Sequence, residues 1–225
     1  MRKYLFIILL PLLVFSCSQE KISQGEIKYE ITYPHLKLGV FMSAALPKEM
    51  SIVFKEKQML ATLKKGKIFS TTILSNEETE SVRMTLTFDE NRIFCDLNPE
   101  EVQELINSQP VYTINGTTKK DSIEGCWASE YSITSLNDSM PPLNAWFTED
   151  LSIQNGAWFS AYSSVKGMPL VYDVERYGML MHANCTKFKE RDVEDKEFEM
   201  EEDLVEVDFE TYEKKVQELF DLLLN

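Results

Sequence analysis

Apolar and polar residues alternate with a period of two along several stretches of this chain. In residues 25–33, isoleucine and tyrosine at odd positions alternate with glutamate, lysine and threonine at even positions. Successive side chains of a β-strand point to opposite faces, so this pattern predicts an antiparallel strand with one buried and one solvated face. The alternation recurs in three later stretches, whose apolar members are Val82, Met84, Leu86 and Phe88, then Trp127, Tyr131 and Ile133, then Met179, Met181, Ala183 and Cys185.

Turn signals separate these stretches. Residues 89–92, Asp-Glu-Asn-Arg, are expected to return the chain into a strand over residues 93–97. Asn115 and Gly116 both tolerate positive φ, so this pair predicts a hairpin turn. Residues 155–166 are expected to hold a turn or two of helix, closed by Gly167 and Pro169.

Three further segments are expected to be helical. Asn98 and Pro99, followed by two glutamates, supply an N-cap, a first-turn proline and first-turn acids, which predict a short helix ending near Asn107. Residues 36–50 are apolar without alternation, and we expect them to cover the mouth of the sheet as a helix, with a mobile apolar flap as the alternative. From Thr211 onward one helical face is apolar, through Tyr212, Val216, Leu219, Phe220 and Leu223.

These elements predict a mainly β protein of the α+β class. The expected architecture is one curved antiparallel sheet or half-barrel, with a few covering helices and a C-terminal helix. No internal repeat or linker interrupts the chain, so residues 25–225 are predicted to form a single globular domain. With 44% apolar residues, 13 phenylalanines and 9 tyrosines, this domain has enough apolar surface to bury a sizeable core.

The charge balance excludes one class of partner. The 225 residues carry a formal charge of −14, and residues 1–16 contribute two positive charges and no acid, so the rest carries −14 − 2 = −16. Such a surface would repel the phosphates of nucleic acid, so no nucleic-acid partner is expected. It also disfavours electrostatic adhesion to anionic lipid.

The first sixteen residues have the organisation of an export signal. Arg2 and Lys3 give a positive start, and Tyr4–Phe15 is an apolar run broken only by Pro11. This run of about 12 residues is too short for a helix that must cross a bilayer with roughly 20. Residues 1–16 are therefore predicted to be a signal peptide.

The sequence after the apolar run predicts lipidation. Val14-Phe15-Ser16-Cys17 resembles the lipobox, in which a small residue precedes a cysteine that accepts a diacylglycerol. Cys17 is thus the predicted lipidation site, and residues 17–24 a lipidated tether. Two or three acyl chains hold a protein durably, so a membrane is an expected partner. No aspartate follows Cys17, which by the same resemblance favours the outer membrane of the cell envelope, on its periplasmic face or at the cell surface.

No residue pattern predicts catalysis, a metal or a cofactor. The only histidines are His35 and His182, and neither has a cysteine or second histidine at ligand spacing. No nucleophile-elbow motif is present, and we expect no catalytic residues. Cys95, Cys126 and Cys185 contain no CxxC pair, and we expect buried thiols, with one disulfide as the alternative.

Residues 190–210 hold twelve acids against two basic residues. Carboxylates at this density suit calcium, but the spacing matches no calcium loop, and the alternation of Val205, Val207 and Phe209 with acids favours a solvated edge strand. Ser122 and Ser139 each follow an aspartate and precede an apolar residue in turn-like sequence. Both triplets resemble a signal for O-glycosylation of exported Bacteroidota proteins, so these serines are candidate modification sites.

Several of these motifs, taken in order, resemble a known family. They are residues 25–33, Gly125-Cys126 entering a strand, Trp146–Leu151, Gly167–Leu170 and the strand end at Cys185–Lys187. This series is similar to that of uncharacterised Bacteroidota outer-membrane lipoproteins. The resemblance implies a half-barrel like that of the lipoprotein localisation factors LolA and LolB, a curved sheet around a helical plug. It implies no catalytic residues, and the acidic stretch and final helix depart from the pattern.

Two functions are compatible with these features. The first is a non-enzymatic binding module that holds an apolar ligand, a lipid or acyl chain, in the curved sheet. The second is a structural or adaptor lipoprotein that docks on an envelope protein complex through its acidic C-terminal region or its final helix.

Overall fold

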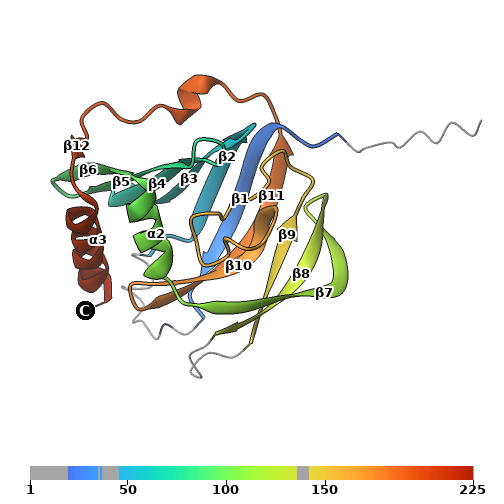
Figure 1. The fold of residues 1–225 in the computed structure, drawn as a ribbon. Helices are drawn as coiled ribbons and strands as arrows, with labels where there is room; N and C mark the ends of the chain where they lie inside the picture. Colours follow the sequence, from blue (N-terminus) through green and yellow to red (C-terminus); the bar gives the residue numbers. More distant parts are fainter. Residues whose placement is uncertain (1–19, 35, 37–45, 136–141, 225) are drawn as a thin grey trace, which may run out of the picture.

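The computed structural model describes residues 20–34, 36, 46–135 and 142–224, and within them twelve strands form one sheet (Figure 1). The order across the sheet is β12-β6-β5-β4-β3-β2-β1-β11-β10-β9-β8-β7. The strands are β1 (Gln24–Thr32), β2 (Glu49–Lys55), β3 (Gln58–Lys65), β4 (Phe69–Asn76), β5 (Ser81–Phe88), β6 (Asn91–Leu97), β7 (Tyr112–Ile123), β8 (Cys126–Ser135), β9 (Leu143–Thr148), β10 (Met168–Arg176), β11 (Met179–Glu190) and β12 (Val205–Glu206).

Strand β1 joins two antiparallel meanders into this sheet. On one side β1 pairs with β2, and β2 to β6 follow one another in chain order. On the other side β1 pairs with β11, and β10, β9, β8 and β7 follow in reverse chain order. Among these strands only β12 pairs in parallel, with β6. The curved sheet lies behind helices α2 (Pro99–Asn107) and α3 (Phe209–Leu224), which confirms the predicted fold class (Figure 1).

Three of the four predicted alternating stretches are confirmed as strands with one buried face. They form β1, β5 and β11, and the returning strand predicted over residues 93–97 is β6. The turn between β5 and β6 contains Asp89 at a φ of +52°. Alternation works here because each strand has the same core on one side along its whole length. The buried residues are Ile27, Tyr29, Ile31, Val82, Met84, Leu86, Met179, Ala183 and Cys185.

The fourth stretch, β8, is a strand whose buried face changes along its length. Ile133 is buried as predicted, but Trp127 is 61% exposed, whereas its neighbours Cys126 and Ala128 are buried. Cys126 and Ala128 belong to the main core, and Ile133 belongs to a second, smaller cluster. Because even and odd residues of a strand point to opposite faces, β8 is packed on one face at its start and on the other at its end. The prediction that Trp127 shares the buried face was therefore wrong.

The predicted hairpin turn at Asn115 and Gly116 is also wrong. Both residues lie inside β7 and pair with β8, and neither has positive φ. The chain turns instead at Glu124 and Gly125, whose φ angles are +49° and +88°. An Asn-Gly pair permits positive φ but does not require it, so pairing along a twelve-residue strand overrides the local preference. The ladder is interrupted only by a register shift between Gly116 and Lys120.

The helices predicted after Asn98 and from Thr211 onward are confirmed. In α2, Asn98 Oδ1 accepts a hydrogen bond from the Glu101 amide at 3.0 Å, and the Glu101 carboxylate accepts one from the Asn98 amide at 2.9 Å. This reciprocal capping box satisfies two amides that the helix itself leaves unpaired. Helix α3 begins two residues earlier than predicted, because Asp208 Oδ1 accepts a hydrogen bond from the Thr211 amide at 2.7 Å. Its buried residues are Phe209, Tyr212, Val216, Leu219 and Phe220.

The acidic segment after β11 runs along the rim of the sheet as η1 (Asp195–Phe198) and β12. Strand β12 is the edge of the sheet, and Val205 is exposed, in agreement with the predicted solvated edge. The strand ends at Glu206, however, and Phe209 is buried as the first residue of α3, so the prediction that Phe209 belongs to the edge strand was wrong. Among the residues that the structure describes, no three metal-ligating side chains come together. None of the described helices is both long and apolar enough to span a bilayer.

Several predictions lie outside the described residues. They concern the signal peptide at 1–16, Cys17 and the next two residues of the tether, His35, residues 37–45 of the apolar segment, and Ser139. At the end of that segment, Leu46 and Pro47 are buried and β2 begins at Glu49.

Candidate functional site

A cavity of about 240 Å³ lies on the inner side of the sheet, between the strands and the two helices. One wall is a row of four side chains that pair directly across β2, β3, β4 and β5, namely Ile52, Ala61, Ile73 and Met84. Met50, Leu63 and Thr71 form the next row along the same strands. These rows lie on one face because cross-strand partners point to the same side of a sheet. The wall is therefore almost entirely aliphatic.

The opposite walls come from segments far away in sequence. Helix α2 contributes Leu105, and α3 contributes Val216 and Phe220. Residues 156–162, between β9 and β10, contribute Phe159 among others. Residues 155–166 form turns and no helix, so the prediction of a turn or two of helix there was wrong. The turns also fill the second, smaller core with Tyr162. The cavity is thus a gap left where helix, turn and sheet surfaces meet.

Most polar groups along the cavity are already paired. Tyr212 Oη donates to the Thr85 carbonyl at 3.1 Å, and Tyr162 Oη donates to the Asp173 carbonyl at 2.8 Å. The side chain of Gln109 donates to two carbonyls, at 3.2 and 3.3 Å, and accepts from the Ala161 amide at 2.9 Å. Burial and nearby charges raise the pKa of these two phenols well above its usual value, so they are uncharged donors at neutral pH.

One ion pair lies at the α3 end of the cavity. The guanidinium of Arg176 contacts the Glu213 carboxylate at 2.7 Å, and Tyr177 Oη donates to the same carboxylate oxygen at 3.0 Å. The Arg176 guanidinium also lies 4.9 Å from the centre of the Tyr177 ring, which stacks on Phe220 at 5.0 Å. The positive charge of Arg176 is therefore balanced within the wall.

Tyr112 differs from the paired residues described above. Its Oη is buried, and no described residue lies within hydrogen-bonding distance of it. The ring packs against that of Tyr162, with 5.6 Å between ring centres. A buried hydroxyl without a partner costs free energy in a folded protein.

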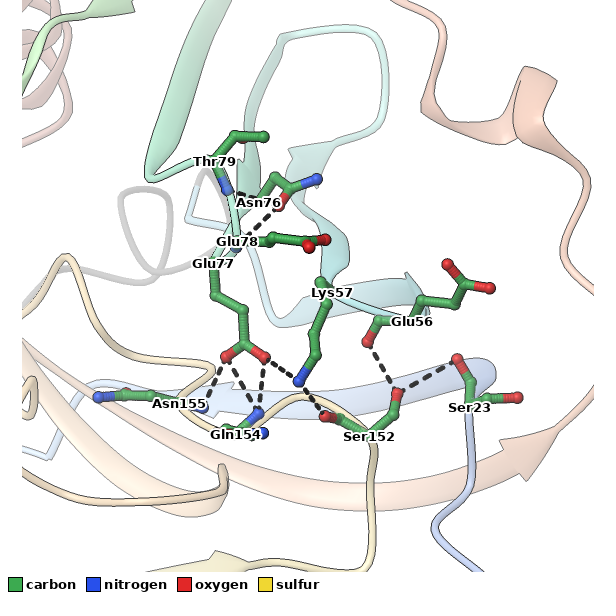
Figure 2. Close-up of polar contacts among 10 residues, drawn as sticks. All are labelled: Ser23, Glu56, Lys57, Asn76, Glu77, Glu78, Thr79, Ser152, Gln154 and Asn155. Atoms are coloured by element: carbon green, nitrogen blue, oxygen red, sulfur yellow. Dashed lines mark hydrogen bonds and ion pairs between the residues drawn. The ribbon is translucent and has the colours of Figure 1, made fainter.

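A second hollow, of about 360 Å³, is polar and open and lies beside the turn between β4 and β5. Figure 2 shows its central feature, the carboxylate of Glu77, which accepts hydrogen bonds from the amides of Gln154 and Asn155 and from Lys57 Nζ. Lys57 Nζ also donates to the Ser152 carbonyl at 2.8 Å. These contacts fasten the segment after β9, which continues into the cavity-lining turns, to the β3–β4 meander.

Partial burial of the Glu77 carboxylate by itself raises its pKa. The hydrogen bonds from Lys57 and from the Gln154 and Asn155 amides favour the charged form more strongly, and the pKa lies below its usual value. Glu77 is therefore a structural clamp that is charged at neutral pH, and every contact it makes in Figure 2 is within the protein.

The predicted candidate residues that the structure describes do not converge on one site. Cys95, Cys126 and Cys185 are buried free thiols, in agreement with the favoured prediction. Burial raises the pKa of Cys95 and Cys185 to about 11 and that of Cys126 to about 12. His182 Nδ1 lies 3.1 Å from a carboxylate oxygen of Asp173, its direct cross-strand partner.

Ser122, the candidate glycosylation site within the described residues, is exposed. It lies in β7 and pairs with Trp127, rather than in a turn, and the hairpin turn follows two residues later. Its amide donates to Asp121 Oδ1 at 2.8 Å, the local contact expected of an Asp-Ser pair.

The cavity itself was not located by the sequence. Its wall residues are ordinary apolar members of strands and helices, and the same alternation marks a filled core. The only available signal was the number of methionines, ten in the chain, of which Met50, Met59, Met84 and Met181 line the cavity.

Comparison with known proteins supports the fold alone. No family model matches the sequence, and no curated protein matches it. Seven solved chains match, and one of them is PNGF-II, with a TM-score of 0.55 and 15% sequence identity over 86% of this chain. The match spans only 33% of the PNGF-II chain, so this protein corresponds to about a third of it.

Two further matches are weaker. MucB has a TM-score of 0.34 and 6% identity, over 82% of this chain and 59% of its own. A β-barrel-like protein of the domain family DUF1849 from Brucella abortus has a TM-score of 0.27 and 10% identity, over 76% of this chain and 99% of its own. Scores this low do not establish a common fold. The chain therefore has a curved-sheet fold of the kind found in one part of PNGF-II, and its function has to come from its own site.

Proposed function

We propose that this chain is a lipid-anchored lipoprotein of the outer membrane whose folded part binds an apolar ligand without catalysing a reaction. The observation that carries the proposal is the cavity on the inner side of the sheet. Its walls are mostly aliphatic and aromatic, most of its polar side chains are paired within the protein, and the carboxylates of Asp173 and Glu175 also lie along it. Ligand sites of proteins are concave and mostly apolar, with a small number of polar groups that orient the ligand.

The cavity volume indicates a ligand of modest size. At about 240 Å³ it exceeds the roughly 150 Å³ of an apolar cavity that binds benzene, and it falls below the roughly 300–1,000 Å³ of sites for drug-sized ligands. A segment of a single acyl chain fits this range better than a complete phospholipid. We therefore assign the cavity to one aliphatic chain or a molecule of comparable volume.

The cysteines among the described residues support a function without catalysis. The three described cysteines are buried, and their raised pKa values disfavour the thiolate that would attack a substrate. His182 does not line the cavity, although its contact Asp173 does.

The anchoring part of the proposal rests on residues 1–17 of the sequence. An apolar run of about twelve residues ends in a small residue and Cys17, which is the pattern that lipoprotein processing reads. In detergent phase partitioning, we expect the processed wild-type protein to enter the detergent phase and the Cys17→Ala protein to stay in the aqueous phase. Equal partitioning of the two would refute lipidation at Cys17.

The alternative role as an adaptor gains no support from the final helix. The apolar face of α3 is buried within the protein, where Val216 and Phe220 close the cavity. Docking through that face would therefore require the helix to leave the sheet. The ligand-binding proposal needs no such rearrangement.

Ligand binding can be tested by filling the cavity. Ala61 is the smallest side chain in the row across β2 to β5, so Ala61→Phe places a phenyl ring in the cavity. The matched control is Thr62→Phe, because the next residue of β3 points to the opposite face. Both changes are made in the Cys17→Ala background, which needs no detergent that would itself occupy an apolar site.

The readout is the fluorescence of N-phenyl-1-naphthylamine, a neutral apolar probe whose emission rises in a dry site. We expect the Cys17→Ala parent and Thr62→Phe to bind the probe with equal affinity. Ala61→Phe should bind the probe at least about tenfold more weakly, because the new phenyl ring occupies space in which the probe would bury its own apolar surface. Circular dichroism confirms that both variants fold. If the parent does not bind, or if both variants bind as the parent does, the cavity is not a ligand site.

A further inference from the structure

Trp127 differs from the other two tryptophans of the chain in its exposure. Trp127 is 61% exposed, whereas Trp146 and Trp158 are half-buried against the main core. It is the second residue of β8, and it pairs with the exposed Ser122 of the edge strand β7. Single apolar side chains are common on protein surfaces, so exposure alone indicates nothing. The place of Trp127 in the fold carries the argument.

The start of β8 is connected to the point at which the chain enters the fold. The carboxylate of Asp150 accepts a hydrogen bond from the Trp127 amide at 2.7 Å, and the backbone carbonyl of Asp150 accepts one from the Ile22 amide at 2.9 Å. The Ile22 carbonyl in turn accepts from the Ser152 amide at 2.9 Å, so residue 22 is held through both of its backbone polar groups. Ile22 and Trp127 therefore lie close together at one end of the sheet.

The predicted lipidation site is a short way upstream in the sequence. Cys17 precedes Ile22 by five positions. A fully extended chain spans at most about 3.6 Å per residue, so Cys17 lies within about 18 Å of Ile22. Acyl chains on Cys17 would thus hold the end of the sheet that carries Trp127 beside the surface of the bilayer.

We propose that the ring of Trp127 inserts into the headgroup region of a zwitterionic phospholipid bilayer and docks this end of the sheet on the membrane. The inference rests on lipidation at Cys17, which is part of the proposed function. Tryptophan suits such a place because its broad ring is apolar and its indole N–H can donate to polar headgroups, and it is enriched at membrane–water interfaces. The anchor keeps the ring at a high effective concentration near the lipid, so a weak contact is sufficient.

The charges around Trp127 decide which lipid it meets. Glu124, in the turn before β8, and Glu149, after β9, are both exposed, and the whole chain carries a formal charge of −14. Anionic headgroups would repel these carboxylates. The contact therefore depends on the apolar ring and not on charge attraction, and phosphatidylcholine is the appropriate bilayer.

The experiment measures how strongly brominated phospholipid quenches tryptophan fluorescence. The processed wild-type lipoprotein and its Trp127→Phe and Trp146→Phe variants are reconstituted into phosphatidylcholine vesicles, with or without bromine on the acyl carbons nearest the headgroups. Trp146→Phe is the matched control, because it removes a half-buried tryptophan and leaves Trp127 in place. Flotation of the vesicles shows whether each protein is bound, with Cys17→Ala as the reference without an anchor.

We expect brominated lipid to remove about a third of the wild-type emission, the share of one tryptophan among three, and about half of the Trp146→Phe emission. Trp127→Phe should lose less than about a tenth of its emission, because its remaining tryptophans are packed against the core. Acrylamide, a quencher dissolved in the water, should reach Trp127 in the Cys17→Ala protein but not in the vesicle-bound wild type.

The outcomes separate this inference from the proposed function. If the wild type floats with the vesicles no more than Cys17→Ala does, lipidation fails, and the contact through Trp127 fails with it. If the wild type floats but brominated lipid quenches it no more than Trp127→Phe, the anchor stands and only the contact is refuted. If acrylamide reaches Trp127 in the bound wild type as easily as in Cys17→Ala, the ring is open to a protein partner instead, and the membrane contact is refuted.

Discussion

Replacing the clamp carboxylate at Glu77 tests how the cavity-lining turns are held to the sheet. Glu77→Gln preserves the size of the side chain but removes its charge and turns one acceptor oxygen into a donor. Three donors then face it: the amides of Gln154 and Asn155, at 2.9 and 2.8 Å, and Lys57 Nζ, at 2.8 Å (Figure 2). The glutamine side chain has one acceptor oxygen, so it cannot accept hydrogen bonds from all three donors.

The size of the effect follows from burial. The side chain of Glu77 is 11% exposed and that of Lys57 31%, so solvent screens the ion pair only in part. Hydrogen bonds to charged groups contribute about 1.5–3 kcal/mol each, but Gln154 is exposed and water can replace part of the loss. We therefore expect Glu77→Gln to lower the free energy of unfolding by about 2 kcal/mol at pH 7, which for a chain of this length lowers Tm by roughly 4–8 °C.

The pH dependence has a definite sign. Because the pKa of Glu77 is lowered by folding, its contribution is complete above the unfolded pKa of about 4.3 and is lost as pH falls through the folded value. Urea unfolding of wild type and Glu77→Gln should thus differ by about 2 kcal/mol at pH 7, and the difference should narrow below about pH 4.3. Glu78→Gln, a change at the exposed neighbouring residue, is the control and should match wild type.

The clamp is refuted if Glu77→Gln unfolds within about 0.5 kcal/mol of wild type at pH 7, the scatter expected of surface substitutions. A difference that persists unchanged in acid would show that the effect comes from packing and not from the carboxylate charge.

Three further predictions concern the wall and the core. Arg176→Met leaves the carboxylate of Glu213 half-buried and without a compensating positive charge, so urea unfolding should show a free energy of unfolding lower by about 2 kcal/mol. Adding Glu213→Leu should restore more than half of this loss, and a double variant less stable than the single one would refute the reasoning. Asn98→Ala removes the reciprocal cap of α2 and should cost about 1 kcal/mol by thermal unfolding, whereas an unchanged Tm would mean that the cap adds nothing. In the Cys17→Ala chain, the three buried cysteines should not react with maleimide near neutral pH until denaturant is added, because burial raises their pKa values to about 11–12. Rapid labelling of the native chain would contradict their burial.

Local signals in the sequence predicted the elements whose neighbours are uniform. The predictions of β1 and β5 are confirmed because each strand faces one core on one side along its whole length, so a period of two is enough to identify the strand and its buried face. The capping box at Asn98 and the apolar face of α3 are likewise contained within a few residues.

The same local signals failed where contacts with segments distant in sequence determine the structure. The pair Asn115 and Gly116 permits a turn, but the partner strand β8 continues to pair along β7, and the turn forms at Glu124 and Gly125. Trp127 is exposed because β8 packs against two different clusters on its two faces, which a single period of two does not describe.

The sequence by itself determined the class of the fold, a curved antiparallel sheet with a short capped helix and a C-terminal helix, because alternation, capping and helical spacing are properties of adjacent residues. The tertiary structure alone decided that β1 joins the two meanders and that α2, α3 and the turns after β9 leave a cavity against the sheet. The physical reason is that an unfilled volume arises where surfaces distant in sequence meet imperfectly. A residue that lines such a gap has the same local pattern as one that fills a core.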